Sequence, residues 1–142
     1  MTSDLVANQD DIRFLTVDDV LAIHSVLIDE ITPGEPKDVL DRGRLEAAVY
    51  APQQTFDGQY LYSSIYEMAA VYLRGLACGH AFQQGNKRVA FGACFAFLDF
   101  NNLDLTITNA QAVAVTLGMV EGRLDVETVA DLLREHSTFG PD

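Results

Sequence analysis

The sequence predicts an all-α protein, a compact bundle of helices around one buried central helix, with one small β-hairpin. Apolar residues recur at helical spacing in several segments, among them Val17–Ile31. The run Val89–Leu98 is apolar almost all round, which is typical of a helix that other helices surround. Residues 53–61 carry an Asp-Gly pair between aromatic residues, the signal of a tight hairpin turn.

The composition limits the class of protein. The chain has 142 residues, of which 49% are hydrophobic, so we expect a single domain over residues 1–142. A net charge of −12 argues against direct binding of nucleic acid, which needs a basic surface. We see no signal peptide and no apolar stretch of membrane-spanning length, and therefore expect a cytoplasmic protein without membrane contact. Cys78 and Cys94 are expected to be buried core thiols.

The first half of the chain predicts two helices. Residues 1–13 are expected to form a loose N-terminal arm. Thr16 is placed to cap a helix that ends before the Pro-Gly-Glu-Pro segment at residues 33–36. His24 falls on the apolar face of this helix, where a hydrogen-bonded core histidine is the favoured interpretation. A short second helix is expected over Arg44–Tyr50.

The second half predicts four more elements around the central helix. Ser63 or Ser64 is placed to cap a largely buried helix that ends at Gly79. Residues 103–108 alternate weakly and predict a short strand or an extended connector. Thr108 or Asn109 is expected to cap a helix to about Val120. Asp125 begins a last amphipathic helix that ends near His136.

The nine residues from His80 to Arg88 bring together groups that suit phosphate chemistry. A sharp turn at Gly85 leads into the central helix, whose first N–H groups and positive dipole end favour an anion. Lys87 and Arg88 add two cations there, a pairing that is unfavourable for the dipole unless an anion binds. His80 lies upstream as a candidate general base. Taken singly, each of these residues is more often structural or simply solvated.

The pattern of His80, Phe82, Asn86, Lys87 and Arg88 resembles the signature of the Doc (death on curing) proteins, the short branch of the Fic superfamily. The resemblance covers most of the chain, from Phe14 to the last helix. It implies the helical Fic/Doc fold. The longer Fic form has Gly at the position of Lys87 and a second Arg at that of Phe91, so the chain resembles the Doc branch.

The resemblance also implies roles for individual residues. His80 is the expected catalytic base. Phe82, from its apolar ring within a polar loop, is interpreted independently of the resemblance as an anchor that pins the loop into the core. The expected phosphate-binding residues of the motif are Gly85, Asn86, Lys87 and Arg88. The hairpin is expected to lie over the active site as a flap that binds the target, through Phe56, Asp57, Gly58 and Tyr60. An ordinary surface loop, with Phe56 and Tyr60 packed onto the core, stays open as the alternative. Where the family usually has an acidic residue that holds Mg²⁺, this chain has Gln84, for which we expect only a weak metal role.

The function that the resemblance implies is that of a Doc-type toxin of a toxin-antitoxin pair. It would transfer a phosphate group from ATP, with Mg²⁺ as the expected metal, to a hydroxyl of a protein such as a translation elongation factor. Its expected partners are that protein substrate and a cognate antitoxin. Two alternatives stay open: adenylyl transfer of the wider Fic type, and a catalytically degenerate binding module, which Gln84 would favour.

Overall fold

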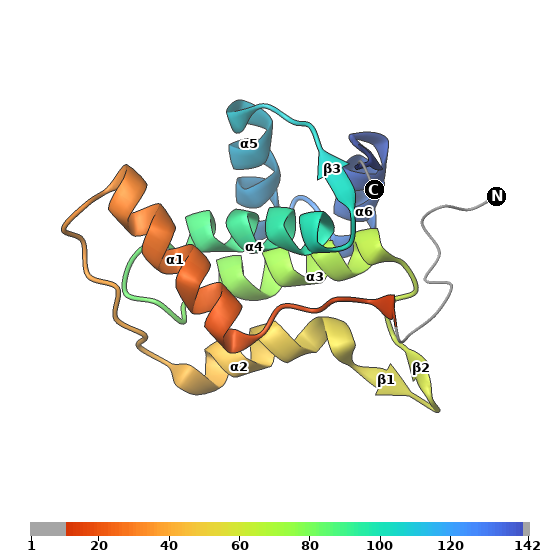
Figure 1. The fold of residues 1–142 in the computed structure, drawn as a ribbon, viewed down its shortest axis with the longest axis horizontal. Helices are drawn as coiled ribbons and strands as arrows, with labels where there is room; N and C mark the ends of the chain where they lie inside the picture. Colours follow the sequence, from red (N-terminus) through yellow and green to blue (C-terminus); the bar gives the residue numbers. More distant parts are fainter. Residues whose placement is uncertain (1–10, 141–142) are drawn as a thin grey trace.

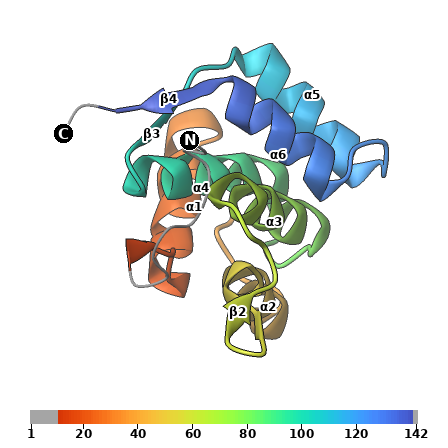
Figure 2. The same cartoon turned by 90° about the vertical axis from the view of Figure 1, so that its right-hand side faces the viewer.

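A computed structural model describes residues 11–140, which form a helical bundle with two short pairs of strands. Figure 1 shows α3 (Ile65–Cys78) and α4 (Asn86–Phe100) side by side in the middle of the molecule. On one side they contact α1 (Val17–Ile31) and α2 (Arg42–Tyr50), and on the other α5 (Asn109–Val120) and α6 (Val126–Glu135) (Figure 2). The expected all-α class is confirmed.

The helix boundaries follow from capping residues that the sequence displays. Thr16, Ser64, Thr108 and Asp125 each accept a hydrogen bond from a backbone N–H in the first turn of α1, α3, α5 and α6. The second helix begins two residues earlier than expected because Asp41 caps it at Arg44 N. A short 3-10 turn over Ala51–Gln53 follows it.

The centre of the bundle is shared by two helices rather than held by one. α4 was expected to be the buried helix, and its buried residues include Ala90, Cys94 and Phe97. However, α3 buries nine of its 14 residues, against six of 15 for α4. α3 packs against α2, α4, α5 and α6, which explains its greater burial. Cys94 is buried as expected, but Cys78 is exposed at the end of α3, so that expectation is wrong.

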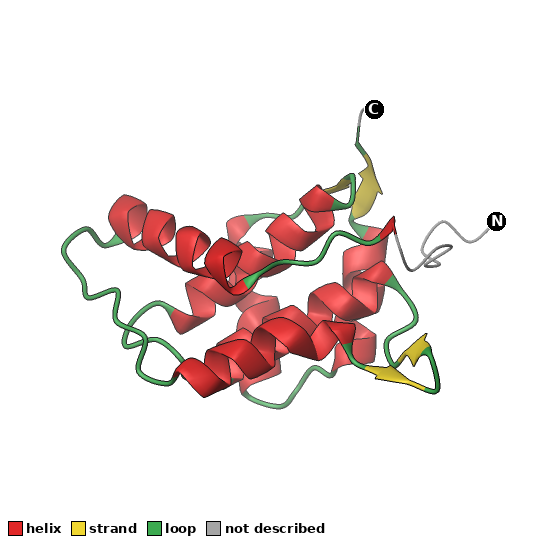
Figure 3. Cartoon of the chain, turned by 60° about the horizontal axis from the view of Figure 1, so that its bottom comes forward, coloured by secondary structure: helices red, strands yellow, loops and turns green. Residues whose placement is uncertain are grey.

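Two strand pairs lie at the edges of the bundle (Figure 3). The expected hairpin joins β1 (Thr55–Phe56) to β2 (Gln59–Tyr60), with Asp57 and Gly58 in the turn at positive φ. A second pair, between β3 (Leu103–Leu105) and β4 (Ser137–Phe139), was not predicted beyond a possible strand after α4. The strand β4 is too short to give a period of its own.

Two further expectations concern the N-terminal arm and membrane-spanning segments. Most of the expected N-terminal arm, residues 1–10, lies outside the described residues. Among residues 11–140, none of the helices combines the length and the hydropathy that a membrane span needs.

Candidate functional site

The motif loop, residues 79–86, joins the end of α3 to the start of α4 at one end of the bundle (Figure 1). His80 is exposed and takes a left-handed backbone conformation, with φ of 53°. Gly79, where the helix was expected to end, is the right-handed C-cap of α3, with φ of −83°. A histidine in the left-handed region carries local strain. The surrounding contacts must therefore hold it there.

A strap formed by residues 38–41 holds one side of the motif loop. The backbone carbonyl of Ala81 accepts hydrogen bonds from Leu40 N at 2.7 Å and from Asp41 N at 3.2 Å. Gln83 N donates to the Asp38 carbonyl at 3.0 Å, which completes a short antiparallel bridge. The Arg44 side chain, which follows the strap, donates to the Gly79 carbonyl at 3.2 Å. The loop is thus paired on one edge like a strand.

Asn86 closes the motif loop from within. Its side-chain oxygen accepts from Phe82 N at 3.0 Å, and its amide nitrogen donates to the Phe82 carbonyl at 2.9 Å. The Phe82 ring is 2% exposed and anchors the loop in the core, as expected. Asn86 was expected among the phosphate-binding residues, and these contacts support a role in holding the loop.

His24 supports the motif loop from α1. Its Nε2 lies 2.7 Å from the Gln84 carbonyl, to which the Nε2–H form donates, and its ring stacks on Phe82 with centroids 3.8 Å apart. Burial lowers the pKa of His24, and the positive charges of Arg88 and Lys37 act in the same direction, against the raising effect of the hydrogen bond. The side chain is therefore a neutral, hydrogen-bonded core histidine, as the sequence indicated.

The start of α4 carries the cations of the site. Gly85 is its N-cap, with φ of 79°, and no side chain caps the helix. The sharp turn that the sequence predicted at Gly85 is therefore present. Lys87 is exposed, whereas Arg88 is half-buried and donates to Thr32 Oγ1 at 2.7 Å. Arg88 also forms an ion pair with Glu35 at 3.4 Å, so its guanidinium already contacts one anion.

A polar cavity of about 330 Å³ brings the expected site residues together. Its lining consists of Ala77, His80, Gln83, Gln84, Gly85, Asn86, Lys87, Arg88 and Val120. His80 and the two cations thus face one space, large enough for a small ligand. His80 follows α3 and the two cations lie in the first turn of α4, so the cavity is lined from both ends of the motif loop.

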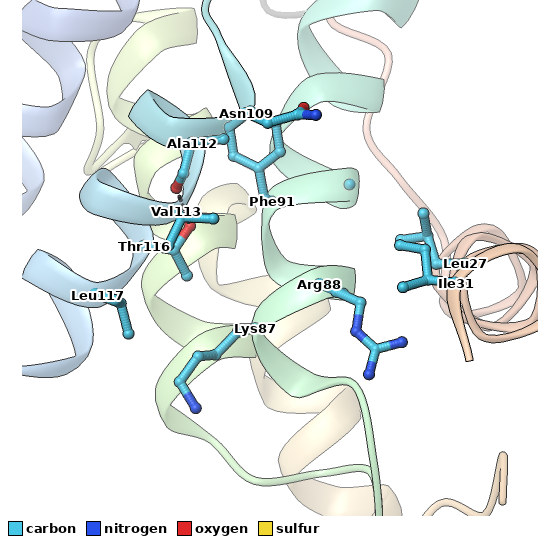
Figure 4. Close-up of a pocket in the computed structure, with 11 residues that line it drawn as sticks. Leu27, Ile31, Lys87, Arg88, Phe91, Asn109, Ala112, Val113, Thr116 and Leu117 are labelled. Carbon is cyan, nitrogen blue, oxygen red and sulfur yellow. Dashed lines mark hydrogen bonds between the residues drawn. The ribbon is translucent and has the colours of Figure 1, made fainter. Parts of the chain in front are cut away.

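A second cavity of about 390 Å³ begins at the same two cations and runs between α1, α4 and α5. Figure 4 shows Lys87 and Arg88 at one end of it, with Leu27 and Ile31 of α1 on one side and the residues of α5 on the other. Its walls are mostly apolar. Lys87 and Arg88 therefore stand at the boundary between a polar and an apolar cavity.

The hairpin does not lie over the motif loop. β2 precedes α3 whereas His80 follows it, so the 14 residues of α3, a length of about 21 Å, separate the two (Figure 1). The expected position of a flap formed by Phe56, Asp57, Gly58 and Tyr60 is wrong. The segment that pairs with the motif loop is the strap. Contact of the hairpin with a target stays a prediction.

The oxygen atoms near the loop do not form a site for Mg²⁺. The Gln84 carbonyl accepts from His24, and the Asn86 amide is closed onto Phe82. Within the described part of the chain, no cluster of three or more His, Cys, Asp or Glu residues is placed to hold a metal. Because Mg²⁺ prefers carboxylate and phosphate oxygens, the residues present do not fit a metal held by the protein.

Sequence reasoning missed four residues that shape this site: Thr32, Glu35, Asp38 and Arg44. They lie 35 or more positions before the residues that they contact in the loop or in the first turn of α4, and the fold brings them together. A polar or charged side chain next to Pro and Gly gives no local sign of such a contact.

Comparison with known proteins agrees with the geometry. The family model described as "Fic/DOC family" matches residues 14–98. The chain is 34% identical over 126 residues to a protein named "Toxin Doc" of Mycolicibacterium smegmatis, covering 89% of this chain and 82% of that protein. It is 29% identical over 122 residues to "Protein kinase doc" of Escherichia phage P1, covering 86% and 94% respectively.

Proposed function

The chain belongs to the Fic/DOC family, and from this premise we propose that it is a Doc-type toxin with protein kinase activity. In this proposal it transfers the γ-phosphate of ATP to a hydroxyl of a protein, such as a translation elongation factor, and a cognate antitoxin restrains it. The names of its relatives, a toxin and a protein kinase, support this direction.

One observation carries the proposal. His80, Lys87 and Arg88 line the same polar cavity at the uncapped N-terminus of α4. A base and two cations that line one cavity at a helix N-terminus form the combination that transfer of a phosphate to a hydroxyl requires.

The proposed roles follow from these positions. His80 takes the proton of the target hydroxyl, whose oxygen forms a bond to the γ-phosphorus while the bond to the bridging oxygen breaks and ADP leaves. Lys87 and Arg88 compensate the charge of the phosphate oxygens. Asn86, Phe82 and His24 keep the loop in place and act only through it. A general base of this kind contributes on the order of 10²–10⁴ in rate.

The test uses ATP labelled separately at the α and the γ phosphate, incubated with the protein, Mg²⁺ and a bacterial lysate. The expected result is label on a protein from γ only, and its loss in His80→Ala. The matched control is His136→Ala, which removes an imidazole at the end of α6 and is expected to keep the activity. Full activity in His80→Ala would contradict the assignment of the base.

Two other outcomes would point to the alternatives. Label from the α phosphate would assign the chain to adenylyl transfer. No label from either phosphate, with the protein folded and free of antitoxin, would favour a binding module. Gln84 is the observation that favours this second candidate, because it brings no charge for a metal.

A further inference from the structure

In the described part of the chain, the polar cavity is lined by cations and by no carboxylate that could hold a metal ion. Its nine lining residues, all within the described range 11–140, include the cations Lys87 and Arg88 but no carboxylate. The uncapped N-terminus of α4 adds further positive potential. A divalent cation entering this space would meet these like charges and no carboxylate among the described lining residues.

Two of the neutral oxygens that line the cavity already accept hydrogen bonds. Gln84, where the family resemblance implies an acidic residue, uses its backbone carbonyl to accept from His24 at 2.7 Å. Asn86 directs both atoms of its side-chain amide at the backbone of Phe82. The side-chain amides of Gln83 and Gln84 remain, and they bring dipoles rather than charge.

Glu35 is the carboxylate that pairs with Arg88, one of the two cations of the cavity. It forms an ion pair with Arg88 at 3.4 Å and accepts from Thr32 Oγ1 at 2.9 Å. It therefore offsets part of the charge of Arg88 and does not stand free as a metal ligand.

We propose that this cavity binds the phosphate chain of its nucleotide without a metal ion held by the protein. Lys87, Arg88 and the N-terminus of α4 compensate the phosphate charge in its place. The inference rests on the proposed function, because it takes a nucleoside triphosphate as the ligand. It differs from the resemblance, which implies Mg²⁺ bound by an acidic residue at position 84.

The experiment measures the dissociation constant of ATP by calorimetry, once in EDTA and once with excess Mg²⁺. We expect ATP to bind at least as tightly in EDTA, since free ATP brings more negative charge to two cations than its Mg²⁺ complex does. Tightening of tenfold or more by Mg²⁺ would overturn the inference and leave the proposed function standing. The absence of ATP binding in both buffers would overturn both.

Matched variants locate the cause. Gln84→Asp is expected to create tightening by Mg²⁺, whereas Gln83→Asp, which adds the same charge one residue away in the same cavity, is not. If the two variants respond equally to Mg²⁺, the assignment to position 84 is wrong. Glu35→Gln is expected to leave the ratio of the two constants unchanged. If Mg²⁺ tightened ATP binding to the unaltered protein and Glu35→Gln removed that tightening, Glu35 would be the metal ligand and the inference would be overturned.

Discussion

The two ends of α3 carry nearly the same backbone geometry for different reasons. At the hairpin end, Asp57 and Gly58 have φ of 55° and 80°, and at the motif-loop end His80 and Gly85 have φ of 53° and 79°. In the hairpin the two residues are adjacent and form one turn, for which Asp-Gly is a preferred pair. In the motif loop they lie five residues apart, and contacts from α1, α2 and the strap hold the segment between them.

The difference shows where this chain concentrates its tertiary restraints. A turn that its own residues favour needs no support, and Phe56 beside it is 76% exposed. A histidine in a strained conformation persists only where its surroundings determine the backbone. Equivalent substitutions at the two ends of α3 should therefore differ in their effect on stability.

The two phenylalanines should differ most. Phe82→Ala removes a fully buried ring that stacks on His24, and we expect a loss of about 3–5 kcal/mol in the free energy of unfolding. Phe56→Ala removes an exposed ring and should change it by less than about 0.5 kcal/mol. Urea denaturation of both variants measures the contrast. Equal losses would mean that the hairpin is also held by its aromatic residue.

Gly58 and Gly85 offer a sharper comparison, because their φ angles agree, at 80° and 79°. A Cβ at Gly58 meets nothing within 4 Å, so Gly58→Ala should cost only the left-handed conformation, roughly 1 kcal/mol. A Cβ at Gly85 would stand 3.1 Å from Ile28 Cδ1 and 3.3 Å from His24 Nε2. We therefore expect Gly85→Ala to cost about 1–3 kcal/mol more, by overpacking. Thermal unfolding with calorimetry measures both, and equal costs would mean that the loop relaxes freely.

Lowering the pH should lower the free energy of unfolding through His24, which supports the motif loop. The pKa of His24 is lowered in the folded protein, mainly by burial, from an ordinary value of 6.5. The unfolded chain therefore binds more protons once the pH falls below about 6.5, and stability decreases from there until the pH passes the folded pKa. Each unit of difference is worth about 1.4 kcal/mol. Denaturation between pH 8 and pH 5 should show this slope, and His24→Gln should have a smaller one. An unchanged slope in that variant would contradict the assignment.

The sequence was sufficient for the parts of the molecule that neighbouring residues determine. Four capped helices, the Asp-Gly turn and the buried Phe82 follow from local chemistry and periodicity. The motif itself supplied His80, Lys87 and Arg88, which the fold brings to one cavity.

What the sequence did not predict depends on contacts between distant segments. The partners of Arg88, Thr32 and Glu35, lie more than 50 residues before it. The strap pairs with the motif loop although α2 and α3 separate the two in the sequence. The hairpin was expected near the active site, although the whole of α3 lies between it and His80 in the sequence. A 14-residue helix places its two ends about 21 Å apart, and this decides which neighbouring segment can reach His80.

The smallest expected effect concerns the strained residue itself. His80→Gly removes an exposed side chain. The backbone at this position has φ of 53°, a conformation that glycine adopts without steric cost. We expect the free energy of unfolding to rise by roughly 0.5–1 kcal/mol while transfer of phosphate is lost. Asp57→Gly is the control at the other end of α3, where Asp already suits the turn, and it should change stability by less. Chemical denaturation and the labelled-ATP assay measure the two quantities on the same samples. A stabilised but inactive His80→Gly would mean that the conformation at position 80 is kept for the imidazole that it presents. A destabilised one would mean that the left-handed backbone is not a strain for this loop, and the contrast between the two ends of α3 would then rest on packing alone.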